Sequence, residues 1–118
     1  MSHYLVAKLP DVDAAFELSE SKRIIEKQLG EEIEFFAYPY GDASAAGPRD
    51  FELAAKAGFK ASLTTRKGVI FAEHANHLQA LPRIMVSGRY QEPQLVKTLI
   101  NGLPTALLNK FSKVNVKP

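Results

Sequence analysis

Short β-forming runs alternate with helical segments along this chain, and that alternation constrains its fold more than any other feature. Three runs are rich in β-branched and aromatic residues: 33–38 (IEFFAY), 59–65 (FKASLTT) and 81–86 (LPRIMV). Helices are predicted over 13–29, between Pro48 and Gly58, after Pro93 and over 103–111. Because parallel strands need crossover connections, this order predicts an α/β fold with a small, mostly parallel sheet flanked by helices.

Residue patterns within these segments predict which faces are buried. Asp11 or Asp13 is expected to cap the first helix, since a short carboxylate accepts from free backbone N–H groups. The first strand is mostly apolar, which favours a strand covered on both faces. Residues 69–71 form a possible fourth strand. The apolar residues expected to face inward are Ala15, Leu18, Ile25 and Leu29 in the first helix, and Leu95, Val96, Leu99 and Ile100 in the helix after Pro93.

Length and composition exclude several classes of protein. The 118 residues suit a single domain over 1–118 that ends in a basic tail at 112–118. The net charge of +2 gives no reason to expect nucleic acid as a partner, and no apolar run is long enough for a membrane span. The chain has no cysteine, which excludes disulfides and thiolate metal sites, and residues 1–9 do not resemble a secretory signal.

Acidic and basic residues are divided between the two halves of the chain. Residues 1–60 carry 11 acidic and 7 basic side chains, whereas residues 61–118 carry 2 acidic and 8 basic ones. The basic end is either a solvated tail or a surface for an acidic partner. A sheet of three or four strands also leaves an open edge, which favours either a homo-oligomer or a piece of a larger domain.

Several segments together resemble one family. The helix at 17–30 leads into FFAYPYGD (35–42), AGFKASLTT (57–65) follows, and LPRI (81–84) comes after a polar loop. This order resembles the polysaccharide deacetylase family, also called the NodB-homology or carbohydrate esterase family 4 domain, over about residues 2–101. The resemblance implies a distorted (β/α) barrel, of which this chain is the C-terminal portion. It also implies hydrolysis of acetyl groups on a polysaccharide or another N-acetylated glycan, with a divalent metal such as zinc as cofactor.

The metal site that the resemblance implies is incomplete in this sequence. Ser2-His3, followed by Leu9-Pro10, resembles the end of the family's H-[S/T]-x-x-H motif, so His3 is the expected metal ligand. The family's Asp-Asp motif and first His have no match, and a catalytic zinc site needs about three protein ligands. His74 and His77, beside Glu73, have a spacing that a helix could use for a metal, although a polar loop is the favoured interpretation of this segment.

The family's catalytic loop motif, R-x-P-[F/Y]-G, is Ala37-Tyr38-Pro39-Tyr40-Gly41 here. The resemblance implies that the backbone N–H of Tyr40 stabilises the oxyanion of the reaction. Because the motif's arginine is replaced by Ala37, Arg83 is the candidate for the guanidinium that orients a carboxylate. The family's late Leu-x-His motif has no clear match.

The same loop carries the expected substrate-binding residues, which are Tyr38, Pro39, Gly41 and Asp42. Either tyrosine could stack on a sugar ring, and Asp42 is either a turn residue or part of the sugar groove. The leading hypothesis is therefore a metal-dependent polysaccharide deacetylase domain of which this chain is an inactive fragment. The alternative is a non-catalytic, self-associating module that binds a glycan or a protein. Localisation stays open, since family members usually act outside the cytoplasm.

Overall fold

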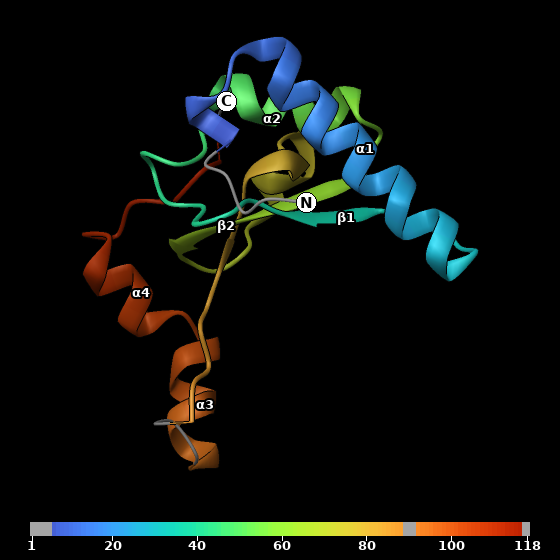
Figure 1. The fold of residues 1–118 in the computed structure, drawn as a ribbon. Coiled ribbons are helices and arrows are strands. Elements are labelled where there is room, and N and C mark those ends of the chain that lie inside the picture. Colours follow the sequence, from blue (N-terminus) through green and yellow to red (C-terminus); the bar gives the residue numbers. More distant parts are fainter. Residues whose placement is uncertain (1–5, 89–91, 117–118) are drawn as a thin grey trace.

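A computed structural model describes residues 6–88 and 92–116 (Figure 1). Its helices are α1 (Asp11–Leu29), α2 (Pro48–Lys56), α3 (Pro93–Ile100) and α4 (Leu103–Leu108). Its strands are β1 (Phe35–Ala37), β2 (Ala61–Lys67) and β3 (Leu81–Arg83). Short 3₁₀ turns cover Val6–Lys8, Ala72–Asn76 and Leu78–Ala80.

The three strands form a parallel sheet in the order β1-β2-β3. Phe35 pairs with Ala61, Leu63 pairs with Leu81, and Lys67 pairs with Arg83 after an irregularity in the ladder. The α/β class and the small parallel sheet flanked by helices are therefore confirmed. The implied barrel is not shown, because the sheet of the described residues is open at β1 and at β3.

Helix α1 begins earlier than the sequence predicts, and the expected aspartate cap is wrong. Pro10 occupies the N-cap position, no side chain caps the helix, and Asp11 lies in the first turn. Ala14 and Leu18 are buried, whereas Ile25 and Leu29 are exposed. The second half of α1 extends beyond the rest of the molecule (Figure 1). Its Lys22 contacts the Phe59 ring and the Gly58 carbonyl, but the predicted inward apolar face does not continue to Ile25 and Leu29.

Strand β1 is an exposed edge rather than a strand covered on both faces. The side chain of Phe35 is 62% exposed, and only Phe36 is half-buried. Phe36 packs its ring against Tyr38 and Phe59 at centroid distances of 4.9 and 5.1 Å. The apolar composition of 33–38 thus marks a strand with one protected face.

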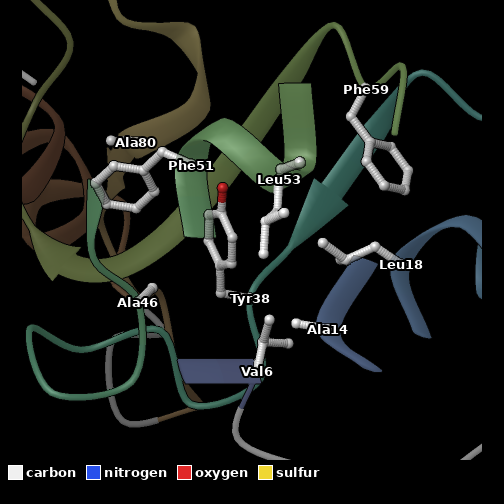
Figure 2. Close-up of a cluster of buried hydrophobic side chains, with 10 residues drawn as sticks. Val6, Ala14, Leu18, Tyr38, Ala46, Phe51, Leu53, Phe59 and Ala80 are labelled. Carbon is white, nitrogen blue, oxygen red and sulfur yellow. The ribbon is translucent and has the colours of Figure 1, made fainter. Parts of the chain in front are cut away.

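Helix α2 and the residue after β1 form the centre of the core. Pro48 is the first residue of α2, where a missing N–H costs nothing, and the Asp50 carboxylate accepts a 2.9 Å hydrogen bond from the Gly47 N–H. Tyr38 lies in the middle of the buried cluster in Figure 2. The cluster joins the first 3₁₀ turn, α1, α2 and the sheet; its labelled members are Val6, Ala14, Leu18, Tyr38, Ala46, Phe51, Leu53, Phe59 and Ala80.

The segment between β2 and β3 differs from the sequence prediction. Strand β2 runs to Lys67, two residues past the predicted end, and residues 69–71 form no strand. The polar loop at 72–80 contains two 3₁₀ turns, and β3 includes Pro82. Only β2 lies between two other strands, which explains why its Ser62 and Thr64 are fully buried.

Helices α3 and α4 form an arm that leads away from the sheet (Figure 1). No residue of α3 is fully buried: of the four residues predicted to face inward, Leu95 and Ile100 are exposed, whereas Val96 and Leu99 are half-buried. Amphipathic periodicity identified the helix correctly but not what it packs on. Within the described residues, no helix is long and apolar enough to cross a membrane.

Candidate active site

The loop of residues 38–42 lies at the carboxyl ends of the parallel strands. It follows β1 directly, and the Tyr38 N–H donates a 3.1 Å hydrogen bond to the Leu63 carbonyl of β2. In open parallel sheets, ligands bind beyond the carboxyl ends of the strands, where loops converge and backbone groups are accessible. The predicted catalytic loop therefore occupies the part of the sheet best suited to a binding site.

Two hydrogen bonds fix the loop to the end of β2. The Thr65 hydroxyl donates to the Tyr40 carbonyl at 2.6 Å, and the Thr65 N–H donates to the Gly41 carbonyl at 2.9 Å. Tyr40 adopts a left-handed backbone with φ 63°, although its side chain is bulky and 58% exposed. A non-glycine residue in this conformation is uncommon and is strained unless its surroundings hold it. The loop is thus a rigid turn with an exposed aromatic ring.

Gly41 allows the close approach between this loop and β2. Its φ is +65°, and a Cβ at this position would lie 2.9 Å from the Thr65 nitrogen. The Gly41 N–H closes a tight turn by donating to the Pro39 carbonyl at 2.8 Å. Gly41 is therefore a structural requirement of the turn as well as part of a family-like motif.

The two tyrosines of the loop have different environments. Tyr38 is 4% exposed, and its hydroxyl donates to the Gln79 carbonyl at 2.9 Å. Burial raises the pKa of Tyr38, so the phenol stays protonated and continues to donate. Its ring belongs to the core, whereas Tyr40 is the exposed tyrosine of the loop.

Asp42 begins the turn that leads toward α2. Its carboxylate accepts from the Ser44 N–H at 2.7 Å, from the Ser44 hydroxyl at 2.6 Å and from the Ala45 N–H at 3.1 Å. The Ser44 hydroxyl and N–H hold the pKa of Asp42 below its ordinary value, and the charge of Arg66 acts in the same direction. Asp42 is exposed and ionised, so it combines the turn role with a carboxylate available at the strand ends.

Arg66 is a polar residue of this region that the sequence did not single out. The predicted strand ends at residue 65, whereas the structure extends β2 through Arg66. Its guanidinium donates to the Ala46 carbonyl and to the Asn115 side chain, and lies 5.5 Å from the centre of the Phe51 ring. The signal that could have found Arg66 is its position at the carboxyl end of a central strand.

Arg83 lies at the carboxyl end of β3 and is exposed. Its position pairs with Lys67, so two cations stand beside each other on neighbouring strands. Arg83 makes no ion pair with any of the residues in 6–88 and 92–116. The guanidinium is available for an anionic group, and its proposed orienting role has no carboxylate partner in the described part of the chain.

The histidines at 74 and 77 serve the packing of the chain. His74 is 1% exposed; its Nδ1 accepts from the Phe71 N–H at 2.9 Å, and its Nε2 donates to the Val114 carbonyl at 2.8 Å. Burial lowers the pKa of His77, with smaller contributions from the charges of His74 and Arg66. Ala72–Asn76 is a 3₁₀ turn rather than the α-helix that a paired metal site would need.

Metal ligands do not gather anywhere in the described structure. Among residues 6–88 and 92–116, no group of three or more His, Asp or Glu side chains could hold an ion. His3, the expected ligand, lies outside the described residues. The described residues therefore do not supply a catalytic metal centre.

Comparison with known proteins adds one structural relationship. No family model matches the sequence, and a search of curated proteins finds no match. The solved structure of the Streptococcus pyogenes deacetylase PplD in complex with acetate superposes with a TM-score of 0.74 at 24% identity. The fold is deacetylase-like. The match covers 85% of this chain but 42% of the streptococcal chain, so this chain spans less than half the length of that protein.

Proposed function

We propose that this chain forms part of a carbohydrate deacetylase domain, and that the loop of residues 38–42 binds the acetylated sugar. The observation that supports the proposal most strongly is the deacetylase-like fold combined with a rigid Pro-Tyr-Gly turn at the carboxyl ends of the strands. The resemblance of the sequence to polysaccharide deacetylases favours an acetamide of an N-acetylated glycan as the substrate. The streptococcal neighbour binds acetate, the acyl product of such a reaction.

Each loop residue has a role in this proposal. The Tyr40 N–H donates to the carbonyl oxygen of the acetamide as that oxygen becomes negative, a role for which a backbone donor in a fixed turn is pre-organised. The Tyr40 ring, which is exposed, stacks on the sugar. Pro39 and Gly41 hold the turn, Tyr38 supports it from the core, and Asp42 binds a sugar hydroxyl.

Amide hydrolysis also needs a group that activates water and a charge that polarises the carbonyl. In the family that the sequence resembles, a divalent metal and an Asp-Asp motif supply both. The described residues do not fit such a metal, because no three of their His, Asp or Glu side chains come together as ligands. We propose that His3 completes a metal site only together with ligands from outside this chain, and that the chain alone is inactive.

Nuclear magnetic resonance titration tests the binding role. We expect an N-acetylated chitooligosaccharide to shift the amide signals of residues 40–42, and its fully deacetylated counterpart to leave them in place. Gly41→Ala should abolish the shifts, because a Cβ there forces the loop away from Thr65. Gly30→Ala is the matched control, since its Cβ meets nothing within 4 Å. Unmoved signals with the acetylated oligosaccharide would contradict the proposal.

An acetate-release assay with added zinc tests the inactivity of the chain. We expect no release from the acetylated oligosaccharide; metal-dependent release would show that the chain carries a complete site.

The coding sequence upstream of Met1 gives an independent check. An in-frame Asp-Asp motif and a second histidine there would support an intact deacetylase, whereas unrelated sequence would favour the non-catalytic glycan-binding module.

A further inference from the structure

The arm formed by α3 and α4 presents an apolar surface with unpaired positive charge. Leu103, Leu107 and Leu108 of α4 are more than half exposed, and Phe111 after the helix is 73% exposed. Residues 93–116 contain Lys97, Lys110 and Lys113 and no acidic residue. Lys113 pairs with Glu73, whereas Lys97 and Lys110 form no ion pair within the described part of the chain. We call residues 103–111 with Lys97 the basic surface.

A cavity opens within the basic surface. It lies between α4, residues 68–71 and residues 111–114, and has a volume of about 410 Å³. Its apolar lining includes Val69, Phe71, Leu103, Ala106 and Phe111. Apolar cavities of about 150 Å³ already hold a benzene ring, so this one has room for an aromatic side chain.

The first turns of α1 present a complementary surface. Phe16 is 63% exposed and Val12 is 79% exposed, one helical turn apart. Residues 11–20 contain four acidic side chains and no basic one. Asp13 and Glu17 make no ion pair within residues 6–88 and 92–116. We call Val12, Asp13, Phe16 and Glu17 the acidic surface.

We propose that a second copy of this chain covers the basic surface, with Phe16 of one copy inserted into the cavity of the other. Charge complementarity selects this occupant: Asp13 and Glu17 lie beside Phe16 on α1, and Lys97 and Lys110, which form no ion pair within the described residues, precede and follow α4 in the sequence. A buried aromatic side chain at the centre with charges at the rim is the usual arrangement of a protein interface. The large exposed apolar residues of both surfaces then leave water together.

The positions of the two surfaces suit a symmetric dimer. The start of α1 and helix α3 lie at opposite ends of the molecule, and α4 lies between those ends (Figure 1). Two copies in antiparallel orientation bring the acidic surface of each against the basic surface of the other, so one two-fold axis forms both contacts. This inference does not depend on the proposed deacetylase role.

Sedimentation velocity tests the inference on the purified full chain at protein concentrations from about 1 μM to about 1 mM. Dimers with dissociation constants in that range are detected there. We expect a concentration-dependent dimer that Phe16→Ala weakens about tenfold or more, because the inserted ring carries a large share of the binding energy. Phe35→Ala is the matched control, since Phe35 is 62% exposed but lies on β1, outside both surfaces. Circular dichroism confirms that each variant is folded.

A charge exchange separates this interface from other modes of association. Asp13→Lys with Glu17→Lys, or Lys97→Glu with Lys110→Glu, should each weaken the dimer, because like charges then face one another. An equimolar mixture of the two double variants should form a dimer of about wild-type stability, since both contacts are again complementary. A monomer at every concentration, equal effects of Phe16→Ala and Phe35→Ala, or no recovery in the mixture would overturn the proposal.

Discussion

At the scale of single residues, backbone conformation limits what this site tolerates. Tyr40 and Gly41 both have positive φ, and the loop that they form is attached to β2 through Thr65. The two residues differ in available space: the Tyr40 side chain extends outward, whereas a side chain on Gly41 meets the backbone of β2. Gly41 and Gly30 both have positive φ, but only Gly41 lies close to another strand, so alanine substitutions at the two positions separate the steric cost from the backbone cost.

Gly41→Ala should destabilise the protein by about 3 kcal/mol, because it adds steric conflict with the Thr65 nitrogen to the cost of a left-handed alanine. Gly30→Ala carries only the left-handed cost, about 1 kcal/mol, since open space surrounds the C-cap of α1. Urea denaturation of both variants measures the difference. Equal losses would mean that the loop moves freely away from β2.

His77 should make stability depend on pH near neutrality. Burial lowers its pKa in the folded state, so the unfolded chain binds more protons as the pH falls through the ordinary histidine value of about 6.5. The free energy of unfolding should therefore decrease from about pH 7.5 to about pH 5.5. His77→Asn should reduce that decrease, as measured by urea denaturation at several pH values. An unchanged pH dependence in the variant would exclude His77 as its source.

At the scale of elements, the helices divide into two groups by what they pack against. Helix α2 contributes Phe51, Leu53 and Ala54 to the core, whereas α3 contributes no buried residue. The turn Leu78–Ala80 belongs to the first group through Gln79, whose side chain donates to the Phe59 carbonyl at 2.7 Å and accepts from the Ser62 hydroxyl at 2.6 Å. We therefore expect α2 to resist local unfolding more strongly than α3 does.

Hydrogen exchange should distinguish α2 from α3 in dilute solution. A short helix that buries no side chain fully is marginal in water, so the amides of α3 should exchange within about tenfold of the rates of an unstructured peptide. The amides of α2 should be protected far more strongly, because opening them exposes the core. Mass spectrometry of peptides from the two helices measures both rates. Equal protection would show that α3 packs on something in solution.

At the scale of the whole molecule, the chain after α4 returns to the body and connects the arm to it. Asn115 donates to the Ala80 carbonyl at 2.8 Å and accepts from the Arg66 guanidinium, while Val114 accepts from His74. The Cα radius of gyration is 15.5 Å, larger than the roughly 13.5 Å of a compact chain of this length. The protruding arm and the second half of α1, which both extend from the body, contribute to that excess.

Asn115→Ala should loosen the arm, because it removes one hydrogen-bond partner each from Arg66 and Ala80. We expect the radius of gyration from small-angle X-ray scattering of the dilute monomer to increase. Asn76→Ala, on an exposed part of a 3₁₀ turn, is the control that should leave it unchanged. A radius of gyration that Asn115→Ala does not alter would mean that the remaining contacts, among them His74 with Val114 and Lys113 with Glu73, suffice to hold the C-terminal segment.

Periodicity and turn chemistry in the sequence determined the helices, the three parallel strands and the position of the Pro-Tyr-Gly loop at a strand end. These properties are local, because a glycine or proline ends an element wherever the chain goes next. Only the tertiary structure decided that Tyr38 is buried, that Arg66 lies at the strand ends, that β1 is an edge and that α3 is uncovered. These properties depend on which segments, distant in sequence, pack against a residue. The spacing of apolar residues predicts that one face of an element is buried, but it does not show which segment buries that face.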